Sequence, residues 1–281
     1  MDPQALYAAV SDADVGWLLA ACAATAISLL AAVRNLTAFA PLRLRTREAL
    51  QTQLAVCGLR IIAPSAVSTP AICARYLTRS GLGAAESLAV VGTAQAAQLL
   101  MTIAVVAALT AFGMDGVALP QPRMIALVAA VALAVLTVLI AASHRIGAVR
   151  RLRDAAVHAI GDVVMHARRR PLTIVAGLAA SAALTLAHVA TFACCVLAVG
   201  GHAPLLALMA IYLAAASAGS LIPTPAGIGP VEAAMIAGLV GTGLGAATAT
   251  AAALLTRAIT VYALAPPGWI ALRSLRRRGL L

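Results

Sequence analysis

Long apolar runs are the feature of this sequence that most limits what it can fold into. A helix needs about 20 apolar residues to cross a hydrocarbon core of about 30 Å. Only 10% of the residues are charged and 63% are hydrophobic, whereas a soluble domain carries about 25% charged residues. The sequence therefore predicts an all-α polytopic membrane protein, a single transmembrane domain over 1–281, and excludes a cytosolic enzyme. Five full spans are expected, at 15–33, 84–112, 124–142, 172–199 and 246–271.

Two further apolar stretches are interrupted, and they predict broken or re-entrant helical hairpins. The first, 51–79, contains prolines and arginines. The second, 203–243, contains the segment IPTPAGIGP, in which prolines remove backbone donors and glycines permit unusual dihedrals. Backbone that leaves helical form at membrane depth needs protein or a wet cavity to complete its hydrogen bonds. If the second hairpin crosses the membrane fully, the chain has seven spans.

The distribution of arginine predicts the orientation in the membrane. Arginine supplies all 20 basic residues, and it is concentrated after the first span, within 145–170 and in the C-terminal tail. Short loops rich in arginine face the cytoplasm, whereas the start of the chain carries only acids. We therefore expect the N-terminus outside and the C-terminus in the cytoplasm. The net charge of +11 is then a mark of topology rather than of nucleic-acid binding.

The chain divides into two related halves. The first half, 1–142, and the second half, 172–281, each run from a Pro-rich break to the sequence GLGAA and then to a long span. Between them, 143–171 has the helical periodicity and basic face of an amphipathic cytoplasmic linker. The orientation given above makes the two hairpins enter from opposite sides. This predicts an inverted repeat, the arrangement by which many transporters build a substrate site at the membrane midplane.

Charged residues inside the apolar regions are the clearest functional signal, since each costs about 3 kcal/mol at the bilayer centre. On the functional interpretation, Arg60, Arg75 and Arg257 offer guanidinium groups to a lipid phosphate, which they can bind bidentately. Glu232 would pair with Arg257 until the head group arrives. On the structural interpretation, the Glu232–Arg257 pair only locks the hairpin and Arg75 extends to the membrane surface.

The Pro/Gly break before Glu232 also has two interpretations. A helix N-terminus freed between Gly227 and Glu232 presents backbone N–H groups to an anionic head group. Alternatively, the break is a kink that lets helices pack. Two breaks in matching places favour the first interpretation.

No catalytic constellation is evident. The sequence has no HExxH, GxSxG or Walker motif and no lysine, so we expect no enzyme activity, no metal and no cofactor. The one exception is the pair Asp12 and Asp14 just before the first span. Such a pair can hold a divalent ion in a lipid-linked glycosyltransferase, but it also suits a helix N-terminal cap.

The segment LIPTPAGIGPVEAAMIAGLVGTGLGAATATAAALLTRAITVYALAPPGW resembles the C-terminal signature of the lysylphosphatidylglycerol synthetase/flippase transmembrane family. That signature is a Pro/Gly-rich break, Glu-Ala and a span containing an arginine. APSAVSTPAICARYLTRSGLGAAESLA is similar to the earlier broken segment of the family. The Gly-Gly of the family's breaks is replaced here by Ala226-Gly227 and by Val67-Ser68. By this resemblance, the positions expected to carry function in the second half are Pro225, Gly227, Gly229, Glu232 and Arg257.

The resemblance implies flippase-like translocation or handling of an anionic or aminoacylated (glyco)lipid in the bacterial cytoplasmic membrane. The implied partners are a phospholipid or a polyprenyl-phosphate-linked lipid, with a separate synthase or transferase as a further possibility. Only the integral membrane part of the family is recognisable, without its aminoacyl-transferase domain, so we expect no lipid aminoacylation by this chain alone. The alternative is a membrane partner or enzyme of cell-envelope glycolipid synthesis that uses Asp12 and Asp14.

Overall fold

The computed structural model describes residues 10–63, 65–111, 171–221 and 224–281, and every regular element in these ranges is helical. Four helical stretches are long and apolar enough to cross a membrane, which confirms a polytopic helical membrane protein. Three of these stretches are α2 (Val15–Phe39), α5 (Ala84–Ala111) and α8 (Pro171–Ala198). The fourth starts at Ala246 and ends at Arg277. The predicted span 124–142 and almost all of the predicted linker 143–171 lie outside the described residues.

The fourth stretch differs from the single regular span predicted over 246–271. It consists of α11 (Ala246–Arg257), a π-helical turn η2 (Ala258–Tyr262) and α12 (Ala265–Arg277). Pro266 and Pro267 lie in the first turn of α12. A proline cannot donate a backbone hydrogen bond and its ring clashes with the carbonyl four residues earlier. The regular α-helix therefore ends at Arg257, before the prolines, and the π-helical turn η2 connects it to α12.

Each half also contains a pair of short helices joined by a break. In the first half these are α3 (Thr46–Arg60) and α4 (Ser65–Arg79). In the second half they are α9 (Leu205–Leu221) and α10 (Pro230–Gly241), with the 3₁₀ turn η1 (Pro225–Gly227) between them. A 15-residue helix is only about 22 Å long, too short to cross the hydrocarbon core alone. We call the pair α3–α4 the first hairpin and the pair α9–α10 the second hairpin.

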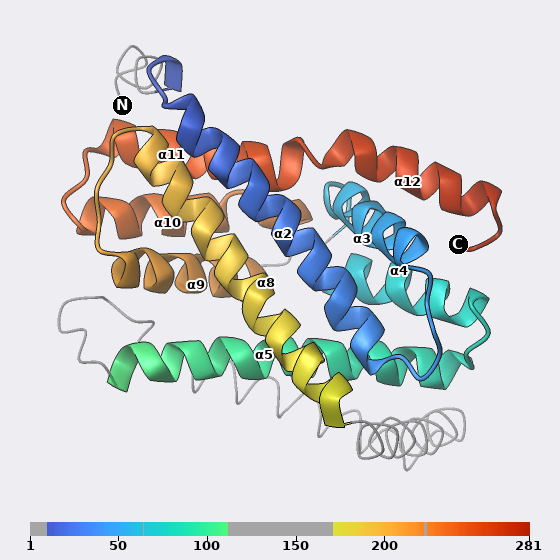
Figure 1. Ribbon diagram of the computed structural model, residues 1–281. Helices are drawn as coiled ribbons and strands as arrows, with labels where there is room; N and C mark the ends of the chain where they lie inside the picture. The colour runs from blue at the N-terminus through green and yellow to red at the C-terminus, as the bar shows by residue number, and fades with distance from the viewer. Residues whose placement is uncertain (1–9, 64, 112–170, 222–223) are drawn as a thin grey trace, which may run out of the picture.

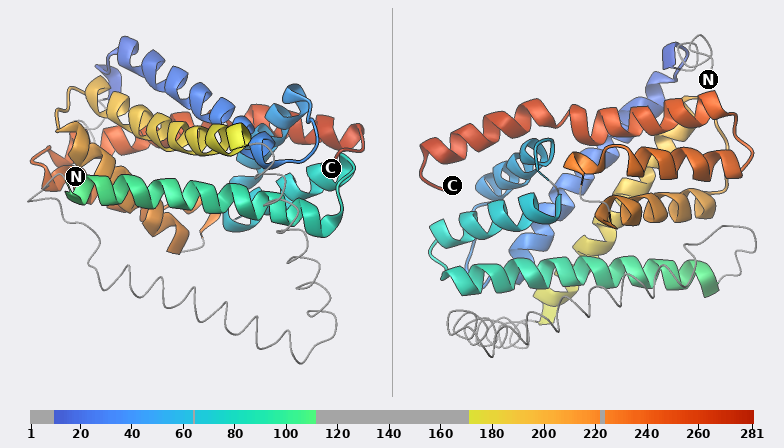
Figure 2. Two further views of the ribbon diagram at one scale, coloured as in Figure 1. Left: turned by 60° about the horizontal axis from the view of Figure 1, so that its bottom comes forward. Right: turned by 180° about the vertical axis from the view of Figure 1, so that it is seen from behind.

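The two breaks lie next to each other near the middle of the molecule, while the outer ends of the two hairpins lie at opposite ends (Figures 1 and 2). α2 and α8 pack along one another, and α3 packs against α12. Along the chain, each half has the same order of elements, which is a long helix, a hairpin and a second long helical stretch. An inverted repeat would have the same order of elements in both halves, as seen here, and the repeat itself stays a prediction.

Each hairpin belongs to its own hydrophobic core. One core joins residues of α2, α3, α4, α5 and α12, including the fully buried Tyr76 and Leu77. The other joins residues of α8, α9, α10 and α11, including Phe192 and Leu239. Small residues make the closest helix contacts, as is usual in membranes. Val231 and Met235 of the second core also line the space between the breaks.

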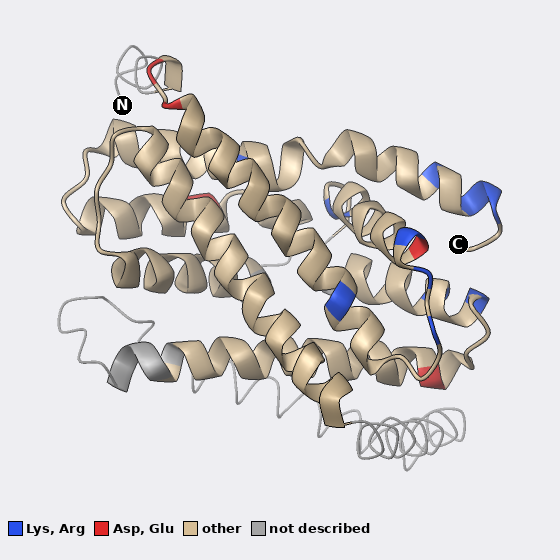
Figure 3. Ribbon diagram, in the orientation of Figure 1, with Lys and Arg blue, Asp and Glu red and all other residues tan. Residues whose placement is uncertain are grey.

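Most described arginines gather at the end of the molecule where α4 and α12 end, and the acidic start of α2 lies at the other end (Figure 3). The chain thus has a basic end and an end with little positive charge, separated by the length of the helices. This polarity agrees with the orientation predicted from the sequence, which stays a prediction.

Candidate functional site

A polar pocket of about 130 Å³ lies where the two hairpin breaks meet. We call it the hairpin pocket. Its polar lining comes from α3, α9, α11 and η2, namely Arg60, Tyr212, Thr256, Arg257 and Thr260. The remaining wall is built from small and apolar residues, among them Gly219, Ala226, Gly227, Val231 and Met235. The pocket is smaller than the roughly 300–1,000 Å³ of a site for a drug-sized ligand, so it fits a head-group fragment such as a phosphate.

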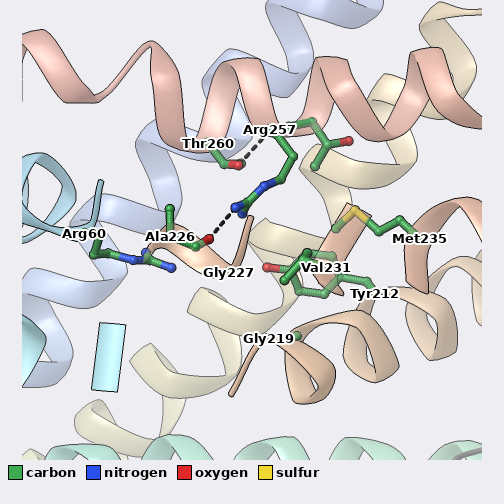
Figure 4. Close-up of a pocket in the computed structure, with 11 residues that line it drawn as sticks. Arg60, Tyr212, Gly219, Ala226, Gly227, Val231, Met235, Arg257 and Thr260 are labelled. Atoms are coloured by element: carbon green, nitrogen blue, oxygen red, sulfur yellow. Dashed lines mark hydrogen bonds between the residues drawn. The ribbon is translucent and has the colours of Figure 1, made fainter. Parts of the chain in front are cut away.

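Arg257 is held at the top of this pocket by two hydrogen bonds. It is the last residue of α11 and is only 7% exposed. Its Nε donates to Oε1 of Glu232 over 2.7 Å, and the pair forms a salt bridge. A terminal nitrogen, Nη2, donates to the carbonyl of Ala226 in the break of the second hairpin (Figure 4). Arg257 therefore ties α11 to the start of α10 and to η1.

Glu232 stabilises the start of α10, and both of its carboxylate oxygens accept hydrogen bonds within the protein. It lies in the first turn of α10, where the positive end of the helix dipole favours a carboxylate. Its Oε2 accepts a hydrogen bond from the backbone N–H of Gly229 over 2.7 Å, and its Oε1 accepts from Arg257. Glu232 is not among the residues that line the hairpin pocket. Glu232 therefore serves as the salt-bridge partner of Arg257 and is not itself placed to contact a ligand in the pocket.

The backbone donors of the break are also already used. The N–H of Gly227 donates to the carbonyl of Thr224, and the N–H of Ile228 donates to the carbonyl of Pro225, each over 3.0 Å. The N–H of Gly229 is bound by Glu232. The first interpretation of the break requires backbone N–H groups that are free to bind an anion, and these three are not free. The lining contributes positive charge through the side chains of Arg60 and Arg257, and anion binding by the first turn of α10 stays a prediction.

The break requires left-handed backbone at two consecutive positions. Ala226 has a φ of 53° and Gly227 a φ of 71°. A non-glycine residue in this region costs roughly 1–2 kcal/mol, and Ala226 occupies one position of the Gly-Gly seen in the related family. Its carbonyl is the acceptor for Arg257. The strained residue is thus held by the same arginine that closes the pocket.

Arg60 reaches the pocket from the other hairpin. It is the last residue of α3 and comes directly before the break between α3 and α4. Its guanidinium group points toward Ala226 and Gly227 (Figure 4). It forms neither an ion pair nor a hydrogen bond with any residue in the described part of the chain. Arg60 is therefore a half-buried cation without a fixed partner there.

The other residues predicted from the sequence are placed differently. Pro225 begins η1 and Gly229 precedes α10, so both shape the break next to the pocket. Arg75 is exposed on α4 and does not line the hairpin pocket. The structure thus brings Arg60, Gly227 and Arg257 together and leaves Arg75 outside.

Three polar residues of the pocket are not among those predicted from the sequence, namely Tyr212, Thr256 and Thr260. Tyr212 comes from α9, and its ring stacks on that of His188 with centroids 6.1 Å apart. Thr260 comes from the π-helical turn and donates to the carbonyl of Thr256 over 2.6 Å. Single-turn π segments occur often at functional sites. The sequence gives no signal for these three residues, since all of them lie in apolar runs.

The acidic pair near the N-terminus has a structural role at one of its two positions. Asp14 is the N-cap of α2, and its Oδ1 accepts from the backbone N–H of Gly16 over 2.6 Å. The Oδ1 of Asp12 accepts a hydrogen bond from the hydroxyl of the neighbouring Ser11 over 3.4 Å. Among the described residues, no group of three acids, histidines or cysteines is placed to hold a metal ion.

Comparison with known proteins identifies one family. The sequence model of the family described as "Lysylphosphatidylglycerol synthase TM region" matches residues 1–268, nearly the whole chain. A search of curated proteins found no match. The family match covers both hairpins and both sides of the hairpin pocket.

Proposed function

This chain belongs to the lysylphosphatidylglycerol synthase TM region family, and on that premise we propose that it is a flippase-like lipid translocase. The lipid it moves has an anionic or aminoacylated head group, and the membrane is the bacterial cytoplasmic membrane. The N-terminus faces outward and the arginine-rich end faces the cytoplasm, in line with the positive-inside rule. The family supports handling of membrane lipids, and the proposal extends this to movement between leaflets.

The observation that carries the proposal is the meeting of two hairpin breaks at a polar pocket inside an apolar chain. Arg60 from the first hairpin and Arg257 at the second line the same cavity. Charged groups at membrane depth are costly and usually mark a substrate path. A pocket between two oppositely entering hairpins suits alternating access, because each half can rock against the other around a fixed site.

The size of the pocket sets what enters it. A cavity of about 130 Å³ accepts a phosphate group and little more, so the acyl chains stay in the bilayer while the head group passes. Guanidinium groups suit this step, since they remain ionised and bind phosphate oxygens in pairs. A separate synthase or transferase is the expected source of any modified lipid.

The alternative is a glycolipid enzyme or its membrane partner that uses Asp12 and Asp14. The capping role of Asp14 accounts for one of these residues without any metal. Replacement of an N-cap aspartate costs about 1 kcal/mol of stability, so an exchange of both residues for alanine tests the alternative without unfolding the chain.

One reconstitution experiment separates these functions. Wild type, Arg257→Ala and Asp12→Ala/Asp14→Ala are placed in vesicles with acyl-labelled phosphatidylglycerol or a labelled polyprenyl phosphate, and leaflet exchange is followed by chemical quenching of the outer label. We expect exchange faster than in empty vesicles for wild type and for the Asp double variant. Arg257→Ala is expected to fall to the empty-vesicle rate. Wild type that moves none of the tested lipids would contradict the proposed function.

A further inference from the structure

The charge balance of the hairpin pocket is unequal. Among the described residues, Arg60 and Arg257 are the only charged ones in its lining. Glu232 is not part of the lining, and its two carboxylate oxygens accept hydrogen bonds from Gly229 and Arg257. The described part of the pocket wall therefore offers two guanidinium groups and no carboxylate.

The uncompensated charge belongs to Arg60. Arg257 already donates hydrogen bonds from Nε to Glu232 and from Nη2 to Ala226. Its charge is therefore largely compensated by the Glu232 carboxylate. Arg60 has no such partner among the described residues. A cation that is half buried in an apolar chain attracts a counter-ion, and an arginine fork binds a phosphate through two parallel hydrogen bonds. The group missing beside Arg60 is therefore an anion.

The same wall is unfavourable for a cationic head group. An ammonium group needs a carboxylate, carbonyl or aromatic face within reach, and like charges brought together across a small site repel strongly. Tyr212 is the one aromatic residue in the lining, and its ring face is stacked on His188. The carbonyl of Ala226 is bound by Arg257. The described lining therefore offers an aminoacyl ammonium group three neutral hydroxyl oxygens, those of Tyr212, Thr256 and Thr260, and no carboxylate.

We propose that the hairpin pocket selects a lipid with an unmodified anionic phosphate head group over the same lipid carrying a lysyl group, and that Arg60 is the specificity-determining residue. This inference rests on the proposed translocase function and narrows its substrate class. The chain then handles the anionic lipid itself, although its family takes its name from the lysylated one. Arg60 acts by its free charge, whereas Arg257 holds the pocket in shape.

Leaflet exchange of two lipids tests the inference. Vesicles contain acyl-labelled phosphatidylglycerol or acyl-labelled lysylphosphatidylglycerol with wild type, Arg60→Gln, Arg60→Lys or Arg75→Gln. Wild type is expected to exchange phosphatidylglycerol about tenfold faster than the lysylated lipid, the ratio for one like-charge contact of modest strength. Arg60→Gln is expected to abolish this preference, and Arg60→Lys to keep most of it. Arg75→Gln is the matched control, since Arg75 is exposed and outside the pocket.

The outcomes separate the inference from the proposed function. Exchange of the lysylated lipid at an equal or higher rate by wild type overturns the inference and leaves a translocase in place. A preference that survives in Arg60→Gln overturns the role of Arg60. Failure of wild type to move either lipid overturns both. Thermal unfolding of Arg60→Gln in detergent is measured alongside and is expected to match wild type, because Arg60 has no partner to lose among the described residues.

Discussion

Replacing Arg257 with alanine is expected to destabilise the protein by about 3–5 kcal/mol, the cost of breaking a buried ion pair by removing one partner. The substitution leaves the Glu232 carboxylate charged with its side chain only 15% exposed. It also removes the donor for the carbonyl of Ala226, a residue already in left-handed backbone. Thermal unfolding in detergent, followed by circular dichroism, measures the effect.

A double variant distinguishes the unpaired charge from a simple loss of packing. Glu232→Gln/Arg257→Gln removes both charges, so most of the lost stability is expected to return while lipid exchange stays at the background rate. Arg79→Ala, at an exposed arginine of α4, is the control and is expected to unfold like wild type. If Arg257→Ala unfolds at the wild-type temperature, the pair is not buried as described. A double variant as unstable as the single one argues against charge as the cause.

Gly268→Ala is expected to give the second large loss of stability, because α3 and α12 cross with backbone against backbone. A Cβ added at Gly268 lies 2.5 Å from the backbone N of Gly58 and 2.5 Å from the carbonyl oxygen of Leu54. Backbone atoms cannot rotate away, so the helices must separate. Overpacking of this kind costs about 1–3 kcal/mol, and we expect the upper end. The same thermal measurement checks it.

The crossing also positions the hairpin pocket. Gly58 lies two residues before Arg60 on α3, so a displaced α3 moves the guanidinium group of Arg60, and lipid exchange is expected to fall with stability. Gly92→Ala on α5 is the matched control, since a Cβ there meets nothing within 4 Å. Equal unfolding temperatures for Gly268→Ala and Gly92→Ala would show that the two helices do not approach this closely.

Much of the fold could be predicted from the sequence because apolar runs and prolines act locally. The predicted starts of α2, α5 and α8 agree with the structure to within one residue. The second hairpin breaks at its Pro/Gly segment, and the first breaks between Arg60 and Ser65. These features follow from helix length and from backbone donors that proline removes, so no distant contact is needed to predict them.

The arrangement of the site was predictable only in part. The pairing of Glu232 with Arg257 was expected because both are charges in apolar surroundings, and the structure places them in a salt bridge. The difference between Arg60 and Arg75 was not predictable, since both are arginines of the first hairpin and only the packing of its helices places Arg60 at the pocket and leaves Arg75 exposed. The close contact of Gly58 with Gly268 was not predictable either, because the two residues lie far apart in the chain.

The central claim is that the two hairpin breaks form a shared head-group site. A density map of the protein in lipid nanodiscs that contain phosphatidylglycerol tests it most directly. We expect density for a phosphate between the guanidinium groups of Arg60 and Arg257, with acyl chains leading out between the helices. Ordered lipid elsewhere on the protein, together with Arg60 and Arg257 in separate apolar surroundings, would contradict the claim.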